Sequence, residues 1–181
     1  GYSSVDGFVG QGSITQENFL GRGWRMSLAA SLGGESSTYQ IGLTDPYFLD
    51  MNLTLGFELY RTDREWTDFS REATGGAIRV GRALGEFSRI LFVYRYEEKE
   101  IYDVEPTAAW EIRAEEGLST ISSITTTFSR NTTDYRPDPS RGGSLETSWE
   151  FAGLGGTEEF SRYLFDYRHF WPAFWGTTFS V

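Results

Sequence analysis

The sequence predicts an all-β fold, a transmembrane antiparallel up-and-down β-barrel. Apolar and polar residues alternate with a period of two, which is typical of strands with one apolar and one polar face. Many runs reach about ten residues, longer than the roughly 5 to 6 of soluble strands and close to the roughly 9 to 11 that span a membrane. Aromatic residues, 17% of the chain, gather at the ends of the runs, as in the girdles of membrane barrels.

Four segments carry the clearest alternation. Their apolar positions are Trp24, Met26, Leu28, Ala30 and Leu32; Met51, Leu53, Leu55, Phe57 and Leu59; Leu145, Thr147, Trp149 and Phe151; and Tyr163, Phe165 and Tyr167. Weaker runs over 8–17, 39–44, 73–84, 89–102 and 118–130 are also predicted as strands. Nine strands result, and a tenth starts near Thr177. Only Pro106 to Glu116 favours a helix, since it begins at proline and ends before Gly117.

The polar positions of these strands suit a hydrated lumen. They combine glycine, serine and threonine with Glu58, Arg79, Arg95, Glu146, Glu150, Asp166 and Arg168. The predicted girdle consists of Trp24, Tyr47, Phe48, Trp66, Phe69, Trp171, Phe174 and Trp175. The alternation alone leaves a soluble β-domain open, for example a carbohydrate-binding sandwich that uses its aromatic rings as sugar platforms.

Composition excludes several other classes. A net charge of −10 argues against nucleic-acid binding, and the absence of cysteine excludes disulfides and thiolate metal sites. No apolar stretch approaches the roughly 20 residues of a spanning helix. The opening residues Gly1, Tyr2, Ser3 and Ser4 carry no signal-peptide pattern, so we expect a mature chain or a piece of a longer one.

No catalytic, cofactor or metal site is predicted, and we expect no enzyme activity. His169, the one histidine, lies in an aromatic strand and has a structural role. Glu146 and Glu150 share a strand face roughly 13 Å apart, at about 3.3 Å per residue, too far for glycosidase chemistry. The acidic cluster of Glu97, Glu98, Glu100, Asp103 and Glu105 is interpreted as a solvated strand end rather than a calcium site.

Three turn sequences sharpen the prediction. They are Asn18-Phe19-Leu20-Gly21-Arg22-Gly23, Asp45-Pro46-Tyr47-Phe48 and the segment Arg130-Asn131-Thr132-Thr133-Asp134-Tyr135-Arg136-Pro137-Asp138-Pro139-Ser140-Arg141-Gly142-Gly143. In this order the three motifs resemble the barrel of the BamA/Omp85 family. The segment 111–117 is similar to a surface loop of that family, and the resemblance covers essentially the whole chain.

The resemblance implies a topology. Residues 1–181 would be the N-terminal portion of a sixteen-stranded barrel, with about ten strands present and the C-terminal strands and periplasmic POTRA domains absent. Gly1, Tyr2, Ser3 and Ser4 would end the first barrel strand, at the lateral gate. Strands would start near 7, 23, 37, 51, 71, 89, 118, 142 and 160. Periplasmic turns would span 18–23, 45–52, 85–88 and 131–143, and surface loops 62–71 and 103–117.

The resemblance also implies a function in the bacterial outer membrane. Members of the family fold and insert β-barrel proteins through a lateral gate, so the expected partners are membrane lipid, nascent barrel clients and accessory lipoproteins. The Arg-Gly-Phe signature of the family's lumenal loop is absent from these residues. Two alternatives stay open, namely a secretion transporter of the same family that handles one partner, and a passive porin or adhesin barrel.

Overall fold

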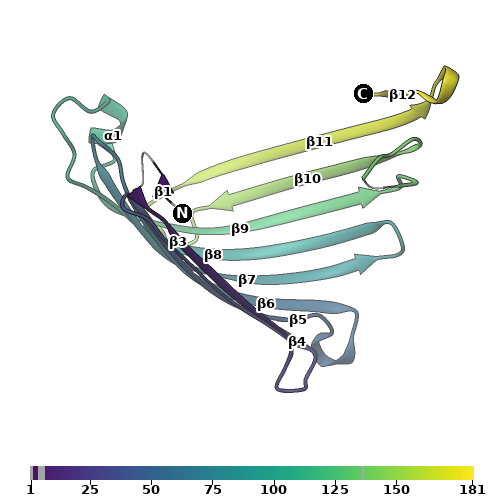
Figure 1. The fold of residues 1–181 in the computed structure, drawn as a ribbon, viewed down its shortest axis with the longest axis horizontal. Helices are drawn as coiled ribbons and strands as arrows, with labels where there is room; N and C mark the ends of the chain where they lie inside the picture. Colours follow the sequence, from purple (N-terminus) through teal and green to yellow (C-terminus); the bar gives the residue numbers. More distant parts are fainter. Residues whose placement is uncertain (1, 4–6, 136) are drawn as a thin grey trace.

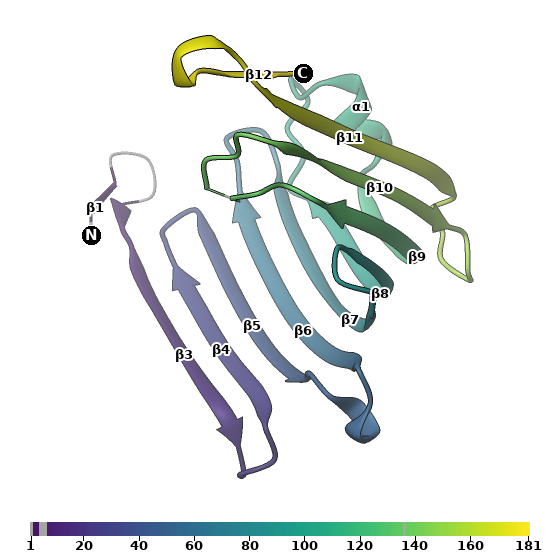
Figure 2. The same cartoon turned by 90° about the vertical axis from the view of Figure 1, so that its right-hand side faces the viewer.

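The computed structural model describes residues 2–3, 7–135 and 137–181, and most of them belong to one antiparallel sheet. Its ten strands follow one another in chain order, each hydrogen-bonded to the next, in a curved and twisted wall (Figures 1 and 2). The strands are β3 (Gly10–Phe19), β4 (Trp24–Leu32), β5 (Ser36–Asp45), β6 (Leu53–Glu65), β7 (Ser70–Leu84), β8 (Ser88–Tyr102), β9 (Gly117–Asn131), β10 (Gly142–Ala152), β11 (Phe160–Pro172) and β12 (Thr178–Ser180).

The predicted strands are confirmed with small shifts at their ends. Starts predicted near residues 71, 89 and 118 are found at Ser70, Ser88 and Gly117, and the tenth strand begins at Thr178. The agreement is close because glycine, proline and aspartate mark nearly every turn, so the period-two pattern has sharp boundaries.

A short hairpin precedes the sheet. β1 (Tyr2–Ser3) pairs antiparallel with β2 (Gly7–Phe8), so that Tyr2 lies opposite Phe8 and Ser3 opposite Gly7. Only Val9 separates β2 from β3. Figure 2 shows the hairpin at the upper end of β3, at the edge of the sheet.

Helical structure is limited to short elements. The α-helix α1 spans Trp110–Ala114, shorter than the predicted 106–116, and its N-cap residue, Ala109, offers no side-chain hydrogen bond to the first turn. Two 3₁₀ turns are η1 (Phe48–Asp50) and η2 (Phe174–Gly176). Within the described part of the chain, no helix has both the length and the apolar character needed to cross a membrane.

Strand register places the two kinds of side chain on opposite faces of the sheet. We call the apolar face the side that bears Leu28, Ile41, Leu59, Ile78 and Phe92, and the polar face the side that bears their sequence neighbours. Register carries these faces across all ten strands, since each paired residue shares a face with its partner.

Burial on the two faces is the reverse of that in a soluble protein. Large side chains of the apolar face are exposed, including Leu59 (64%), Tyr163 (72%) and Phe165 (75%). Most buried residues of the polar face are small or charged, including Ala73, Ala77, Ser123, Glu97 and Glu150; Ile101, also on this face, is a large apolar exception. A β-sandwich would cover the apolar face with a second sheet, and the described residues provide no such layer. An apolar face of this extent suits lipid.

Alternate connections lie at opposite ends of the strands. The connections β3–β4, β5–β6, β7–β8, β9–β10 and β11–β12 share one end, which we call the turn rim, along the lower and right-hand side of Figure 1. The other connections, including α1, lie at the opposite end, the loop rim. The turns predicted at 18–23, 45–52, 85–88 and 131–143 therefore share a rim, opposite the predicted loops at 62–71 and 103–117.

Side-chain caps build the longest connection of the turn rim. Asn131 Oδ1 accepts hydrogen bonds from the backbone N–H and the hydroxyl of Thr133, at 3.0 and 2.6 Å. The Asp134 carboxylate accepts the backbone N–H groups of Tyr135, Ser140 and Arg141 and, at 2.5 Å, the Ser140 hydroxyl. These bonds, the hydroxyl first, hold the pKa of Asp134 well below its usual range.

The start of β10 requires glycine. Gly142 has φ +97, and a Cβ atom there would clash with the backbone carbonyl of Thr132. We expect Gly142→Ala to lower the free energy of unfolding in detergent by roughly 2 to 4 kcal/mol, because it adds a backbone clash to a left-handed conformation. Urea-induced unfolding measures the change.

Gly85→Ala is the matched control. Gly85 has φ +78, but a Cβ atom there would meet only open space, so the conformational cost of about 1 kcal/mol applies alone. Equal losses in the two variants would show that the contact with Thr132 is unimportant.

Asp134 gives a prediction for pH. Its pKa is depressed in the folded state, so its contribution to the turn is fully present above its unfolded pKa of about 3.9 and is lost only as pH falls through the lower folded value. Trypsin cleavage after Arg141, measured relative to an unstructured peptide at the same pH, should therefore be equally slow from neutral pH down to the lower limit of trypsin activity. Asp134→Asn should accelerate it, whereas Asp138→Asn, an exposed carboxylate in the same connection, should not.

Candidate functional site

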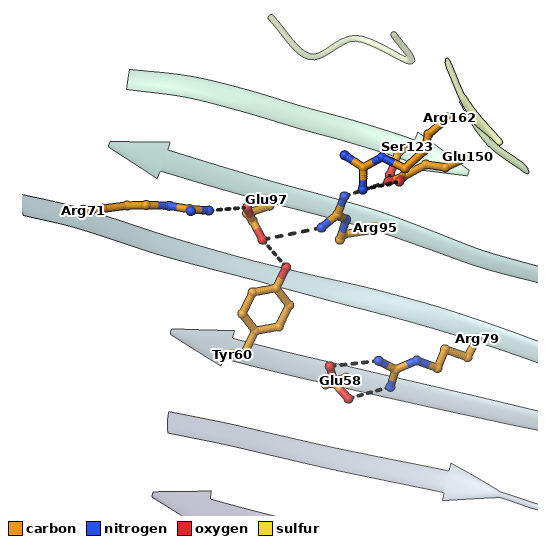
Figure 3. A network of polar contacts seen from close by, with 9 residues as sticks. All are labelled: Glu58, Tyr60, Arg71, Arg79, Arg95, Glu97, Ser123, Glu150 and Arg162. Carbon is orange, nitrogen blue, oxygen red and sulfur yellow. Dashed lines mark hydrogen bonds and ion pairs between the residues drawn. The ribbon is translucent and has the colours of Figure 1, made fainter. Parts of the chain in front are cut away.

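A network of charged and hydroxyl side chains crosses the polar face from β6 to β11. Its members are Glu58, Tyr60, Arg71, Arg79, Arg95, Glu97, Ser123, Glu150 and Arg162, shown in Figure 3. Two of its bonds, Tyr60–Glu97 and Arg95–Glu150, join strands that are not neighbours in the sheet. Such bonds add to the backbone ladder, which links only neighbours.

Glu97 of β8 is one centre of the network. Its side chain is buried, with the residue only 6% exposed. Tyr60 of β6 donates its hydroxyl hydrogen to the carboxylate at 2.5 Å, and the guanidinium groups of Arg71 and Arg95 lie 3.8 and 4.0 Å from it. The carboxylate therefore has a donor and two positive neighbours, as a buried charge requires.

Gly75 makes the contact between Tyr60 and Glu97 possible. It lies on β7, directly opposite Tyr60 on one side and Glu97 on the other. A Cβ atom at Gly75 would meet the Tyr60 hydroxyl at 2.8 Å and its ring carbon Cζ at 2.9 Å. The missing side chain lets the tyrosine ring reach across β7 to the next strand.

Glu150 of β10 is the second centre. It accepts hydrogen bonds from Arg95 at 2.7 Å and from the Ser123 hydroxyl at 3.0 Å, and Arg162 of β11 lies 3.7 Å away. Ser123 is fully buried on β9, directly opposite Arg95 of β8 and diagonal to Glu150 of β10. A small residue again lets two long side chains meet across an intervening strand.

Arg79 and Glu58 pair separately, between β7 and β6. The guanidinium group meets both carboxylate oxygens, at 2.5 and 3.0 Å, in the bidentate geometry that is strongest for this pair. With the two centres, this pair links six consecutive strands, β6 to β11, by side chains. We call these strands the cross-linked wall.

The opposite edge of the sheet differs. The polar positions of β3 and β4 are small or uncharged, except for Glu17 and Arg25, which pair at 2.8 Å next to the turn rim and are more than half exposed. Gly10 and Gly12 have open space where a Cβ atom would lie. This edge is held by its backbone ladder, with little reinforcement from charged side chains among the residues that the structure describes.

The structure locates part of the predicted gate beside this edge. Tyr2 and Ser3 form β1 and pair with β2, immediately before β3. Gly1 and Ser4 lie outside the described residues. The gate assignment itself stays a prediction.

Other predicted site residues have varied outcomes. Glu146 and Glu150 share the polar face, as predicted, and Glu98 and Glu100 are exposed. The prediction of a solvated strand end is wrong for Glu97, which the curvature of the sheet buries against Arg71 and Arg95. The described residues contain no group of three or more acidic or histidine side chains placed to hold a metal ion.

His169 lies on the apolar face among aromatic rings. Its ring centroid is 4.3 Å from that of Trp171, and its Nδ1 atom is 3.3 Å from the hydroxyl of Tyr167. Its backbone N–H and C=O groups pair with Val181. These contacts are those of a packed strand residue, in line with the structural role predicted for it.

Tyr60 and Ser123 were missed as members of a site. The sequence does allow Glu97 to be placed on the polar face, because it lies two residues from Arg95 in the same strand and must share its face. No comparable sequence signal exists for contacts between β6 and β8, which depend on the curvature of the sheet.

Comparisons with known proteins agree with this geometry. Residues 18–181 match the Omp85 superfamily domain. The chain belongs to the Omp85 superfamily. The outer membrane protein assembly factor BamA of Nitratidesulfovibrio vulgaris is 31% identical over 170 residues, which cover 93% of this chain and 22% of the relative. BamA of Neorickettsia risticii is 24% identical over 165 residues, or 90% of this chain and 22% of the relative.

A solved structure supports the same fold. The crystal structure of BamA from Haemophilus ducreyi lacking POTRA domains 1–3 superposes with a TM-score of 0.76 at 19% identity, covering 93% of this chain and 36% of that one. This likeness confirms the predicted all-β barrel fold. The Omp85 match and the BamA relatives confirm the predicted family and the outer-membrane location. The chain spans about a fifth of the length of these curated Omp85 relatives.

Removal of a network centre should weaken this Omp85 barrel. We expect Glu97→Gln to lower the free energy of unfolding in detergent by roughly 1 to 3 kcal/mol, because Arg71 and Arg95 lose a buried counter-charge. Glu98→Gln is the matched control, since its side chain lies exposed on the apolar face, where it accepts a hydrogen bond from the Tyr96 hydroxyl at 3.2 Å. A loss in Glu97→Gln no larger than in the control would contradict the proposed reinforcement.

Proposed function

We propose that residues 1–181 are the N-terminal portion of the barrel of an outer membrane protein assembly factor, which folds β-barrel proteins and inserts them into the membrane. The names of the related BamA proteins support this function. Further strands would close the barrel, because open sheet edges leave backbone groups unpaired in lipid at several kcal/mol each. POTRA domains would lie on the periplasmic side.

The proposed mechanism rests on one observation. The strands of the cross-linked wall are joined by side-chain bonds, and those of the β3–β4 edge have few. Side-chain bonds link β6 to β11, whereas β3 and β4 depend on their ladder. A sheet built in this way opens first at its unreinforced edge. The hairpin of β1 and β2 lies at that edge, so Gly1, Tyr2, Ser3 and Ser4 are the proposed gate residues.

The proposed action is physical rather than enzymatic. When the seam beside the first strand opens, unpaired N–H and C=O groups become available to an incoming strand of a client protein. The client gains backbone hydrogen bonds by β-augmentation and continues to fold from that template. The cross-linked wall would keep the rest of the barrel closed meanwhile.

The proposed partners follow from the surfaces. The apolar face meets outer-membrane lipid, and the gate edge meets nascent β-barrel clients. Accessory lipoproteins would bind the complete protein as parts of an assembly complex. The net charge of −10 argues against nucleic acid as a partner.

A secretion transporter of the same family is the second candidate, and a passive pore the third. Both use the barrel without opening its seam, since the cargo or solute passes through the lumen. A lock on the seam therefore distinguishes them from an assembly factor.

The test is a reversible disulfide in the full-length protein. Ser3→Cys paired with a cysteine in the last barrel strand should stop client assembly into vesicles under oxidising conditions, and reductant should restore it. The matched control joins permanent neighbours, Ser31→Cys with Thr38→Cys on β4 and β5, and should leave assembly unchanged. Full assembly activity with the seam locked would overturn the proposed gate.

A further inference from the structure

Three connections of the turn rim repeat one small motif. Phenylalanine is followed by a large apolar residue and then by glycine or aspartate, in Phe19-Leu20-Gly21, Phe48-Leu49-Asp50 and Phe174-Trp175-Gly176. In each motif the phenylalanine carbonyl accepts the N–H of the residue three positions later, always with an N···O distance of 3.2 Å. The three connections thus share one tight turn.

The middle residue of each turn has an unfavourable backbone conformation. Leu20, Leu49 and Trp175 have φ values of 55, 56 and 55 degrees. Hairpin turns with positive φ at this position normally use asparagine, aspartate or glycine, because a larger side chain crowds the backbone in the left-handed region. The left-handed backbone conformation therefore does not explain why leucine or tryptophan occupies this position.

Packing does not explain the choice either. Leu20 is 72% exposed, Leu49 is 70% exposed and Trp175 is fully exposed. These side chains project from the tips of their turns instead of entering a core. A residue that violates a local rule without a compensating contact in the fold points to a contact outside it.

The arrangement of the three tips indicates what they contact. They extend from the β3–β4 turn, at one edge of the sheet, to the β11–β12 turn near the other, all on the turn rim (Figure 1). On this rim the strands end in aromatic rings of the apolar face, including Trp24 and Trp171. A single docked protein would cover one sector of this arc, whereas a bilayer interface meets the whole of it.

We propose that Leu20, Leu49 and Trp175 are interfacial anchors, which insert into the boundary between headgroups and acyl chains on the turn-rim side of the membrane. The proposal rests on the membrane-barrel placement in the proposed function. The backbone of each turn would hold an apolar side chain beyond the end of its strands, where it fixes the depth of the barrel. Arg22, whose guanidinium lies 5.1 Å from the centre of the Trp24 ring, would lie at headgroup level beside the first anchor.

One turn of the same rim provides a built-in control. In the β7–β8 connection the positive φ belongs to Gly85, and the next residue is the exposed Glu86. This tip follows the usual turn chemistry and carries a charge. It should stay in water while the three apolar tips do not.

The experiment measures depth with spin labels. Leu20→Cys, Leu49→Cys, Trp175→Cys and Glu86→Cys are made one at a time in the full-length protein, otherwise cysteine-free, and labelled in vesicles of phosphatidylethanolamine and phosphatidylglycerol. Collision with oxygen, which prefers lipid, is compared with collision with a water-soluble nickel chelate. We expect oxygen to dominate at the three tips and nickel to dominate at Glu86.

A label at Ile78→Cys, on the apolar face, separates the two proposals. If Ile78 contacts lipid while the tips resemble Glu86, the anchors are refuted and the barrel placement stands. Tips shielded from both reagents would show a protein partner and would also refute the anchors. A water-exposed label at Ile78 would instead refute the membrane placement itself.

A second measurement uses unlabelled protein. Asparagine tolerates positive φ better than leucine, so Leu20→Asn with Leu49→Asn should preserve the unfolding temperature in detergent and lower it in vesicles. Equal temperatures for the variant and the parent protein in vesicles would overturn the proposal.

Discussion

Inside hydrocarbon, every backbone N–H and C=O group needs a hydrogen-bond partner, and the architecture of this chain follows from that requirement. The chain meets it with a continuous antiparallel ladder from β3 to β12. Because the ladder fixes the register, paired residues on neighbouring strands lie on the same face of the sheet. One face therefore stays apolar across all the strands. The exposure of Tyr163 and Phe165, unusual for a soluble protein, follows from the same constraint.

Curvature gives the polar face a second level of organisation. Side chains on strands two apart in the sheet come within bonding distance, provided that the residue between them is small. Gly75 serves this purpose between Tyr60 and Glu97, and Ser123 serves it between Arg95 and Glu150. The cross-linked wall and the β3–β4 edge thus share the same kind of backbone ladder but differ in the number of charged side-chain bonds. This difference supports the proposal that the barrel opens at one seam.

The motifs that resemble the Omp85 family are turn-building sequences. Asn18 accepts the N–H of Gly23, Asp45 accepts the N–H of Tyr47 and the indole N–H of Trp24, and Asp134 organises the β9–β10 connection. Each therefore has a local reason to keep its residue types. The apolar tips in these turns have no such local reason, which makes the surrounding membrane the natural explanation for them.

The strand boundaries, the two faces and the family could be predicted from the residues alone, since period-two alternation and turn residues act over a few positions. The alternation also placed Glu58, Arg79, Arg95 and Glu150 on the polar face. Which side chains of this face meet is known only from the folded sheet, because Tyr60 and Glu97 are 37 residues apart in the chain and Arg95 and Glu150 are 55 apart. Those contacts depend on how far the sheet curves, a property of all ten strands together that no local pattern encodes.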